Sequence, residues 1–138
     1  MAKSGAMQGE RPWPTELRLG PDRRALTVTF DNGERFALAA EYLRVMSPSA
    51  EVQGHSASER RTVGGKRDVA IRDVQPVGNY AVRLVFDDGH DTGLFTWDYL
   101  VELGREHADR WRTYCDALAA SGQSRDPPPS RPSPPRGR

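Results

Sequence analysis

An internal repeat constrains the fold of this 138-residue chain more than any other feature. Residues 26–43 read L-T-V-T-F-D-N-G-E-R-F-A-L-A-A-E-Y-L, and residues 82–100 read V-R-L-V-F-D-D-G-H-D-T-G-L-F-T-W-D-Y-L. Each copy has an alternating stretch that ends in Phe-Asp, an Asn-Gly or Asp-Gly pair, a second short stretch and an acidic-Tyr-Leu sequence. We expect each copy to form a small unit with one apolar face, and the two units to pack together.

Each copy predicts a β-hairpin. Asn32-Gly33 and Asp88-Gly89 suit the positive φ angles that two-residue hairpin turns require. Apolar residues alternate before both turns, as in a strand with one buried face. The residues expected on that face are Leu26, Val28 and Phe30 in the first copy, and Tyr80, Val82, Leu84 and Phe86 in the second.

Another strand candidate precedes each hairpin, at residues 16–19 and 68–74. The predicted order is therefore β-β-β-α, repeated. Antiparallel hairpins that pack with short helices make one compact α+β domain, which is the fold class that we expect.

The second copy continues into a helix. Thr96 is a suitable N-cap, and Asp98 lies in the first turn, where a carboxylate interacts favourably with the helix dipole. We expect Gly104 to interrupt this helix, because glycine is a poor helix former.

A further helix follows, because Trp111, Tyr114, Cys115 and Leu118 fall on one helical face. Gly122 is expected to end it. Cys115 lies within the apolar stripe, so we interpret it as a small core residue, since reactive thiols need an electropositive and exposed setting.

The two ends of the chain differ from the body in composition. Residues 121–138 contain six of the eleven prolines and no large apolar residue, which predicts a disordered Pro/Arg-rich tail. Residues 1–12 are expected to be a flexible N-terminus, which leaves residues 13–120 as the domain. The tail carries a net charge of +3 and the rest of the chain −2. Nucleic-acid binding is therefore not expected of the body.

The sequence also predicts the compartment. Cys115 is the sole cysteine, so no intramolecular disulfide can form. No apolar run reaches the length of a membrane span, and the first ten residues lack the apolar core of a signal peptide. We expect a cytoplasmic protein that does not enter the membrane.

A polar stretch of 21 residues, 47–67, separates the two units. A loop of this length in a compact domain is usually functional or disordered. Gly64-Gly65-Lys66 does not match a phosphate-binding loop, because Arg67 stands where that motif has Ser or Thr. An anion-binding role for Lys66 and Arg67 stays open, beside a simple glycine turn with solvated charges.

His90 directly follows the second hairpin turn and admits two interpretations. It is either a residue that hydrogen-bonds locally, or a metal ligand whose second ring nitrogen is oriented by a carboxylate. A lone histidine does not make a zinc site, which needs four donors. No complete catalytic set is present either, so we do not expect an enzyme.

Several stretches together resemble one family. They are A-E-Y-L-R-V-M-S-P-S-A-E-V-Q-G-H, G-K-R-D-V-A-I, P-V-G-N-Y-A-V-R-L-V-F-D-D-G-H-D-T-G and F-T-W-D-Y-L. The chain resembles, from about residue 13 to 122, the domain at the N-terminus of γ-butyrobetaine hydroxylase and trimethyllysine hydroxylase. This domain also occurs as a stand-alone bacterial domain of unknown function.

The resemblance implies a metal position that this chain does not complete. In the hydroxylases, a Cys-Pro-Cys-x-x-Cys run and a later histidine bind structural zinc. The cysteine positions correspond to Ser47, Ser49 and Val52, and the histidine to His90. We therefore expect either a hydrogen bond between His90 and the loop at Ser47 and Ser49, or a different iron or zinc site. The second alternative would use His90 with His55 and a carboxylate such as Glu51 or Asp91.

The resemblance also guides the functional hypothesis. Related domains occur fused to iron–sulfur-cluster carrier ATPases, and the oxygenase domain is absent from this sequence. We expect a non-catalytic adaptor domain in iron–sulfur cluster or metalloenzyme maturation, with a carrier ATPase or a metalloenzyme as its protein partner. The alternative is a metal-binding domain centred on His90, and no other cofactor is expected. The predicted interaction surface comprises Ser47, Ser49, Gln53, His55, Lys66, Arg67, Asp88, His90 and Asp91.

Overall fold

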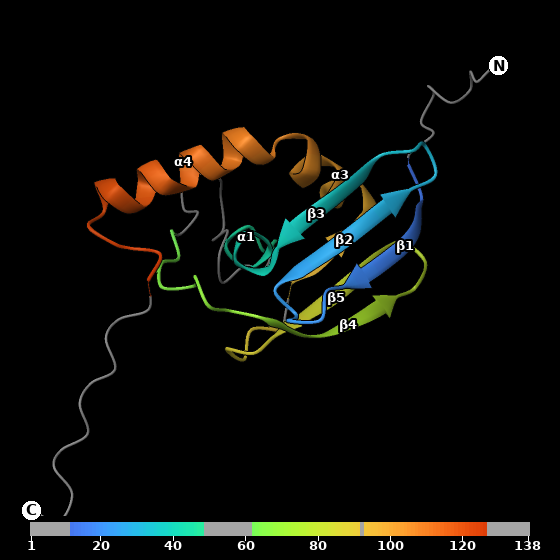
Figure 1. Ribbon diagram of the computed structural model, residues 1–138, viewed down its shortest axis with the longest axis horizontal. Helices are drawn as coiled ribbons and strands as arrows, with labels where there is room; N and C mark the ends of the chain where they lie inside the picture. The colour runs from blue at the N-terminus through green and yellow to red at the C-terminus, as the bar shows by residue number, and fades with distance from the viewer. Residues whose placement is uncertain (1–11, 49–61, 92, 127–138) are drawn as a thin grey trace, which may run out of the picture.

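The computed structural model describes residues 12–48, 62–91 and 93–126. They form two three-stranded antiparallel sheets, ordered β1-β2-β3 and β4-β5-β6 (Figure 1). The predicted α+β class is confirmed. The strands are β1 (Pro14–Leu19), β2 (Ala25–Phe30), β3 (Arg35–Ala39), β4 (Ile71–Val77), β5 (Ala81–Phe86) and β6 (Leu94–Thr96).

Each sheet continues directly into a helix, so the β-β-β-α order occurs twice. Helix α1 (Ala40–Val45) follows β3, and α3 (Trp97–Arg105) follows β6. A further helix, α4 (His107–Ala120), lies beyond α1, on the side of the molecule away from β1 and β2 (Figure 1). In the described residues, no helix has the length and apolar character needed to cross a membrane.

The core lies on the inner faces of the two sheets and under the helices. Leu26, Val28 and Phe30 of β2 are buried, as the alternation predicts. In the second copy Val82, Leu84 and Phe86 are fully buried, whereas Tyr80 is 53% exposed. Tyr80 precedes β5, in the turn after β4, so its predicted place in the core is wrong.

The strand before the second hairpin lies later than predicted. β4 begins at Ile71 rather than at Asp68 and runs through Pro76. Pro76 is tolerated because β4 is the edge of its sheet, where one side of the strand makes no ladder bonds. Part of the preceding segment pairs elsewhere: Gly65 N–H donates to Ser124 O at 2.8 Å, and Arg67 N–H donates to Arg125 O at 2.9 Å.

Two tyrosine hydroxyls join the repeated units in a reciprocal way. Tyr42 of α1 donates to the carbonyl oxygen of Leu103 in α3 at 2.7 Å. Tyr99 of α3 donates to the carbonyl oxygen of Met46, directly after α1, at 2.6 Å. Both tyrosines come from the acidic-Tyr-Leu sequences of the repeat. The repeat therefore supplies the contact that holds its two copies together.

The start of α3 is where the sequence predicts it, but the predicted interruption at Gly104 does not occur. Thr96 Oγ1 accepts a hydrogen bond from the backbone N–H of Tyr99 at 3.1 Å, which confirms the N-cap. Gly104 does not interrupt the helix, which continues to Arg105. A Cβ on Gly104 would lie 2.3 Å from Cγ of Phe36, so this glycine serves the close packing of α3 against β3.

Helix α4 ends at Ala120, before Gly122 with its φ of 72°, as the sequence predicts. Residues 121–126, the first part of the segment predicted to be a disordered tail, are described and contact the body. Residues 127–138 and the predicted flexible segment 1–11 lie outside the described residues.

Candidate functional site

His90 and Ser47 meet between the two units. Ser47 Oγ and His90 Nε2 lie 2.9 Å apart, and both residues are buried. Ser47 follows the end of α1, and His90 follows the turn after β5, so each unit supplies one partner. This contact corresponds to the first of the two arrangements expected for His90.

Gly93 makes the approach of Ser47 possible. A Cβ at this position would lie 2.3 Å from Ser47 Oγ and 3.3 Å from the ring of Phe95. The chain after the hairpin turn must therefore carry a glycine there for the serine hydroxyl to remain beside His90. Sequence reasoning did not select Gly93, because only the fold brings it against Ser47.

Asp88 is the charged centre of the same region. Its Oδ2 accepts from Lys66 Nζ at 2.6 Å and from Arg44 Nε at 2.9 Å, and its Oδ1 accepts from the backbone N–H of His90 at 3.1 Å. Burial raises the pKa of this carboxyl, but hydrogen bonds from Lys66 and His90, with the charge of Arg44, outweigh burial and lower the pKa to about 2. Asp88 is therefore ionised at neutral pH and fixes the turn that carries His90.

Arg44 belongs to this cluster, although the sequence did not single it out as a site residue. The sequence feature that could have identified it is its position three residues before Ser47. The Nη1 atom of Arg44 is buried and has no hydrogen-bond partner in the described structure. A buried donor without an acceptor costs about 1–3 kcal/mol, so this arginine is held in place by Asp88 at some cost.

The segment around Lys66 is held by the chain after α4. The two backbone bonds to Ser124 and Arg125 run beside it, and Arg67 Nε pairs with the carboxylate of Asp126. Arg67 therefore forms part of this connection between segments, and none of its described contacts reaches Asp88 or His90.

Arg125 anchors that connection to the helices. Its Nε and Nη2 donate to the two carboxylate oxygens of Glu41, both at 2.8 Å. Its guanidinium also lies over the ring of Trp111, 5.0 Å from the centroid. Glu41 is only 6% exposed, whereas the side chain of Arg125 is 33% exposed, so the ion pair is half-buried. Sequence reasoning missed it, because Arg125 lies in a stretch whose composition predicts disorder.

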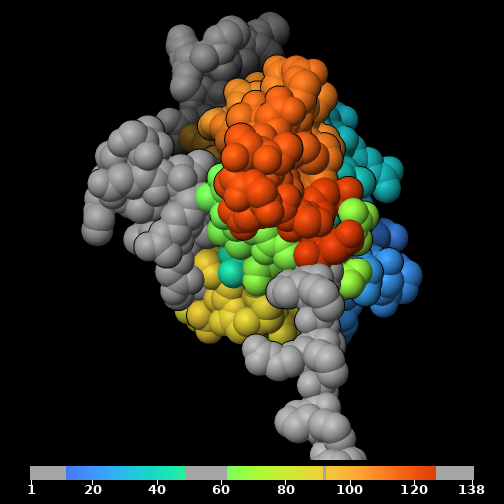
Figure 2. Space-filling view, turned by 90° about the vertical axis from the view of Figure 1, so that its left-hand side faces the viewer, coloured from blue at the N-terminus to red at the C-terminus, as the bar shows by residue number. Residues whose placement is uncertain are grey.

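The fold thus brings together part of the predicted interaction surface. Figure 2 shows the segment from residue 62, the turn after β5 and the chain after α4 on one face of the molecule. Asp91 is exposed beside this region. Ser47, Lys66, Asp88 and His90 are linked by the contacts above, whereas Ser49, Gln53 and His55 lie outside the described residues.

The residues at the zinc positions of the hydroxylases do not fit that metal site here. Ser47 and His90 lie side by side, as two ligand positions of one site would, but a serine hydroxyl is not a zinc ligand of the thiolate kind. Within residues 12–48, 62–91 and 93–126, no group of three or more His, Cys, Asp or Glu side chains is placed to hold a metal ion. Glu51, Val52 and His55 lie outside those ranges.

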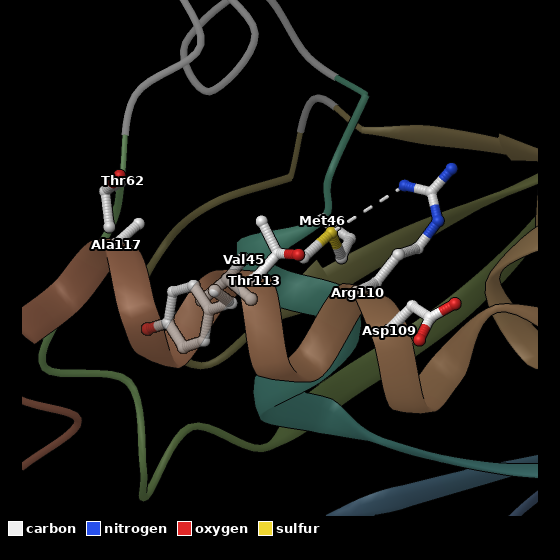
Figure 3. A pocket seen from close by; sticks show the side chains of 8 residues that line it. Val45, Met46, Thr62, Asp109, Arg110, Thr113 and Ala117 are labelled. Carbon is white, nitrogen blue, oxygen red and sulfur yellow. Dashed lines mark hydrogen bonds between the residues drawn. The ribbon is translucent and has the colours of Figure 1, made fainter.

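An open pocket of about 240 Å³ lies between the end of α1 and the side of α4 (Figure 3). Val45 at the end of α1 and Met46 directly after it line the pocket, and Arg110 Nη1 lies 4.0 Å from the sulfur of Met46. The other described lining residues are Thr62, Asp109, Thr113, Tyr114 and Ala117. Most of this wall is apolar, so the pocket suits an apolar side chain rather than a charged ligand.

Comparisons with known proteins identify the family. A family model described as gamma-butyrobetaine hydroxylase-like, N-terminal, matches residues 17–101. One NMR solution structure is 44% identical to the chain, and the match covers 89% of this chain and 97% of that one. A second NMR solution structure is 45% identical, and the match covers 93% of this chain and 96% of that one. Each has a TM-score of 0.74. A crystal structure of a protein of unknown function from Acidithiobacillus ferrooxidans, of the DUF971 family, is 41% identical. It covers 66% of this chain and 91% of its own, with a TM-score of 0.56.

No protein with a curated description matches the chain significantly. The family model covers more than half of the sequence and includes both copies of the repeat. The chain therefore belongs to the gamma-butyrobetaine hydroxylase-like N-terminal domain family.

Proposed function

We propose that this chain is a non-catalytic adaptor domain that binds another protein, with a role in iron–sulfur cluster or metalloenzyme maturation. The observation that carries the proposal is the apolar pocket between α1 and α4. It is lined by Val45 and Met46, the residues that directly precede Ser47, and by the side of α4.

The pocket has the chemistry of a protein-binding surface. Met46 is an unbranched and polarisable side chain that adapts its shape to different partners. Val45 and Ala117 add apolar surface on either side. A wall of this kind accepts an apolar side chain that a partner inserts as an anchor, the usual centre of a protein interface.

The polar residues around His90 support binding rather than catalysis. Ser47 has no exposed surface, so its hydroxyl cannot reach a substrate even though His90 lies 2.9 Å away. Asp88 is occupied by Lys66, Arg44 and the backbone of His90. These groups hold the surface in shape and do not form a nucleophile–base pair that faces a cavity.

The choice of partner comes from the family resemblance. Related domains occur fused to iron–sulfur-cluster carrier ATPases. Two domains that are fused in one protein often occur elsewhere as separate proteins that bind each other. We therefore propose a carrier ATPase of this class as the partner, which would dock on the α1–α4 pocket.

Two alanines of α4 provide a matched test. Ala117 lines the pocket, whereas Ala119 is exposed on the same helix and does not line it. Ala117→Glu places a carboxylate in the apolar pocket and should weaken binding to the purified carrier ATPase by about tenfold or more, since burying an unpaired charge is costly. Ala119→Glu adds the same charge elsewhere and should leave binding unchanged. Isothermal titration calorimetry measures both.

The outcomes separate the surface from the partner. Equal weakening by both variants would show that the pocket is not the binding surface. No heat of binding with the native chain, and no co-purification with a carrier ATPase or a metalloenzyme at native expression levels, would refute the proposed partnership. Circular dichroism of both variants checks that each is folded.

A further inference from the structure

A second groove lies at the other end of the molecule, and it is built from aromatic side chains. It has a volume of about 260 Å³. Its described lining residues come from the start of β1, the turn between β4 and β5 and the start of α3. They are Pro12, Trp13, Tyr80, Thr96, Trp97 and Asp98.

Two aromatic rings of this groove are exposed, and contacts within the domain hold its two tryptophans in place. Trp13 is 48% exposed and Tyr80 is 53% exposed; they are two of the three exposed large hydrophobic residues in the described structure. The rings of Trp13 and Trp97 meet edge to face, with centroids 6.3 Å apart. Trp97 Nε1 donates to Asn79 O at 2.9 Å, and the backbone N–H of Trp13 donates to Asp31 at 3.0 Å. Fixed and exposed aromatic rings are a prepared binding surface.

The groove offers hydrogen-bond donors as well as rings. Within the described part of the chain, the indole N–H of Trp13 and the hydroxyl of Tyr80 have no protein acceptor. A matching ligand should present carbonyl oxygens and compact apolar rings, with few N–H groups of its own. Proline-rich segments in the polyproline II conformation have this chemistry, because proline lacks the backbone N–H and leaves the carbonyls exposed.

The chain itself carries such a segment. Residues 127–136 read P-P-P-S-R-P-S-P-P-R, with six prolines and two arginines. Asp98 also lines the groove, beside the aromatic rings. In Figure 1 the described chain ends at residue 126, beyond α4, whereas β1 starts and β4 turns into β5 at the opposite end of the long axis. A tail from another molecule meets the groove more readily than the molecule's own tail.

We infer that the groove of Trp13, Tyr80 and Trp97 binds the proline-rich segment 127–136 of a second copy of the chain. The contact is heterologous, since the groove of one copy takes the tail of the next. It lies away from the α1–α4 pocket, so it does not depend on the proposed function.

Concentration-dependent association of the full-length chain tests this inference. The weight-average mass by sedimentation equilibrium should rise above 15.4 kDa as the concentration increases. A synthetic peptide of residues 127–136 should shift the indole N–H signal of Trp13 in the NMR spectrum, but not that of Trp111 on α4. Trp13→Ala and Tyr80→Ala should each weaken peptide binding by about tenfold.

Leu94→Ala is the matched control, because Leu94 is also exposed, at 39%, but does not line the groove. It should leave peptide binding unchanged. In the full chain, replacement of Pro132, Pro134 and Pro135 by serine should abolish the rise in mass.

Three results would overturn the inference. The first is a constant mass with no peptide-induced shift. The second is association that survives the proline substitutions, which would mean that the rings pair with some other surface. The third is a difference in the Trp13 signal between the native and proline-substituted chains that is the same at every concentration. That result would assign the groove to the molecule's own tail.

Discussion

His90 is best understood as one half of a buried hydrogen bond between the two repeated units. Its Nε2 lies 2.9 Å from Ser47 Oγ, and Gly93 leaves the space that the serine needs. The resemblance to the hydroxylases implies that metal links the same two chain positions in those proteins. In this chain a serine and a histidine make the link directly, which removes the need for a thiolate ligand at residue 47.

Ser47→Ala tests how much this hydrogen bond stabilises the fold. The variant leaves a polar nitrogen of His90 without the hydroxyl, and we expect the free energy of unfolding to fall by about 1–2 kcal/mol. Urea denaturation measures the change. A double-mutant cycle with His90→Ala isolates the pair: a coupling energy near zero would show that the two side chains do not stabilise each other.

Asp88→Asn tests the charged centre at low pH. The pKa of Asp88 is lowered to about 2 from an ordinary value of 3.8, so its ionised form stabilises the folded state. This contribution is complete above about pH 4 and is lost as the pH falls from about 4 to 2. We expect it to be about 2 kcal/mol at neutral pH, given the size of the pKa shift.

Urea denaturation at several pH values between 2 and 6 measures the effect. The native chain should lose stability over the lower part of this range, and the Asp88→Asn variant should show a smaller slope there. Asp31→Asn in the first repeat is a suitable control, because in the described residues no lysine or arginine pairs with the carboxylate of Asp31. Equal slopes for Asp88→Asn and the native chain would contradict the assigned role.

At the scale of elements, alternation predicted most of the sheet core, because a strand with one buried face has a period of two residues. Val82, Leu84 and Phe86 are fully buried, as expected. Tyr80 follows the same period but lies before β5, where the chain is still turning. Periodicity does not mark the residue at which a strand begins. The exposed ring of Tyr80 and its place in the aromatic groove therefore could not be read from the pattern.

Gly104 illustrates the same limit in a helix. Its low helix propensity predicted a break, whereas its function is to admit the ring of Phe36. That contact joins β3 of the first unit to α3 of the second, and nothing local in the sequence indicates it. Gly104 is therefore required by a tertiary contact and does not act as a local helix breaker.

Gly104→Ala gives a prediction whose sign decides between the two explanations. Helix propensity alone would make the alanine variant more stable by about 1 kcal/mol. A Cβ at 2.3–2.6 Å from three ring carbons of Phe36 must instead displace that side chain, so we expect a net loss of about 1–3 kcal/mol. Thermal denaturation measures the difference. Phe36→Leu in the Gly104→Ala background should recover part of the loss, and an alanine variant more stable than the native chain would contradict the packing argument.

At the scale of the whole molecule, the end of the domain was the feature hardest to predict. Proline and arginine dominate residues 121–138, and such composition predicts a segment without a core. Residues 121–126 nevertheless pack, because Arg125 finds a buried carboxylate in α1 and a tryptophan ring in α4. These partners are 84 residues and 14 residues away in the sequence. Composition averages over a segment, whereas one well-placed side chain can order its neighbours.

Arg125 also connects the domain to the candidate site. Its backbone oxygen accepts from Arg67 N–H, which holds the segment that carries Lys66. Lys66 in turn bonds Asp88, whose other oxygen holds the backbone of His90. The described contacts thus form a continuous path from the end of the chain to the junction of the two units. Loss of Arg125 should therefore affect more than the ion pair with Glu41.

Arg125→Ala leaves Glu41 buried without its partner, and we expect the free energy of unfolding to fall by about 2–4 kcal/mol. Arg112→Ala is the matched control, since Arg112 pairs with Asp109 on the exposed face of α4, and such a pair stabilises by less than about 1 kcal/mol. Hydrogen exchange distinguishes a local loss from a connected one. If the path is real, the backbone N–H groups of Gly65, Arg67 and His90 should exchange faster in Arg125→Ala at pH 7. The backbone N–H of Val28 in β2 is the internal reference, and its exchange rate should change only as much as the free energy of global unfolding requires. Faster exchange at Gly65 and Arg67 with no change at His90 would confine the role of Arg125 to the end of the chain and leave the site independent of it.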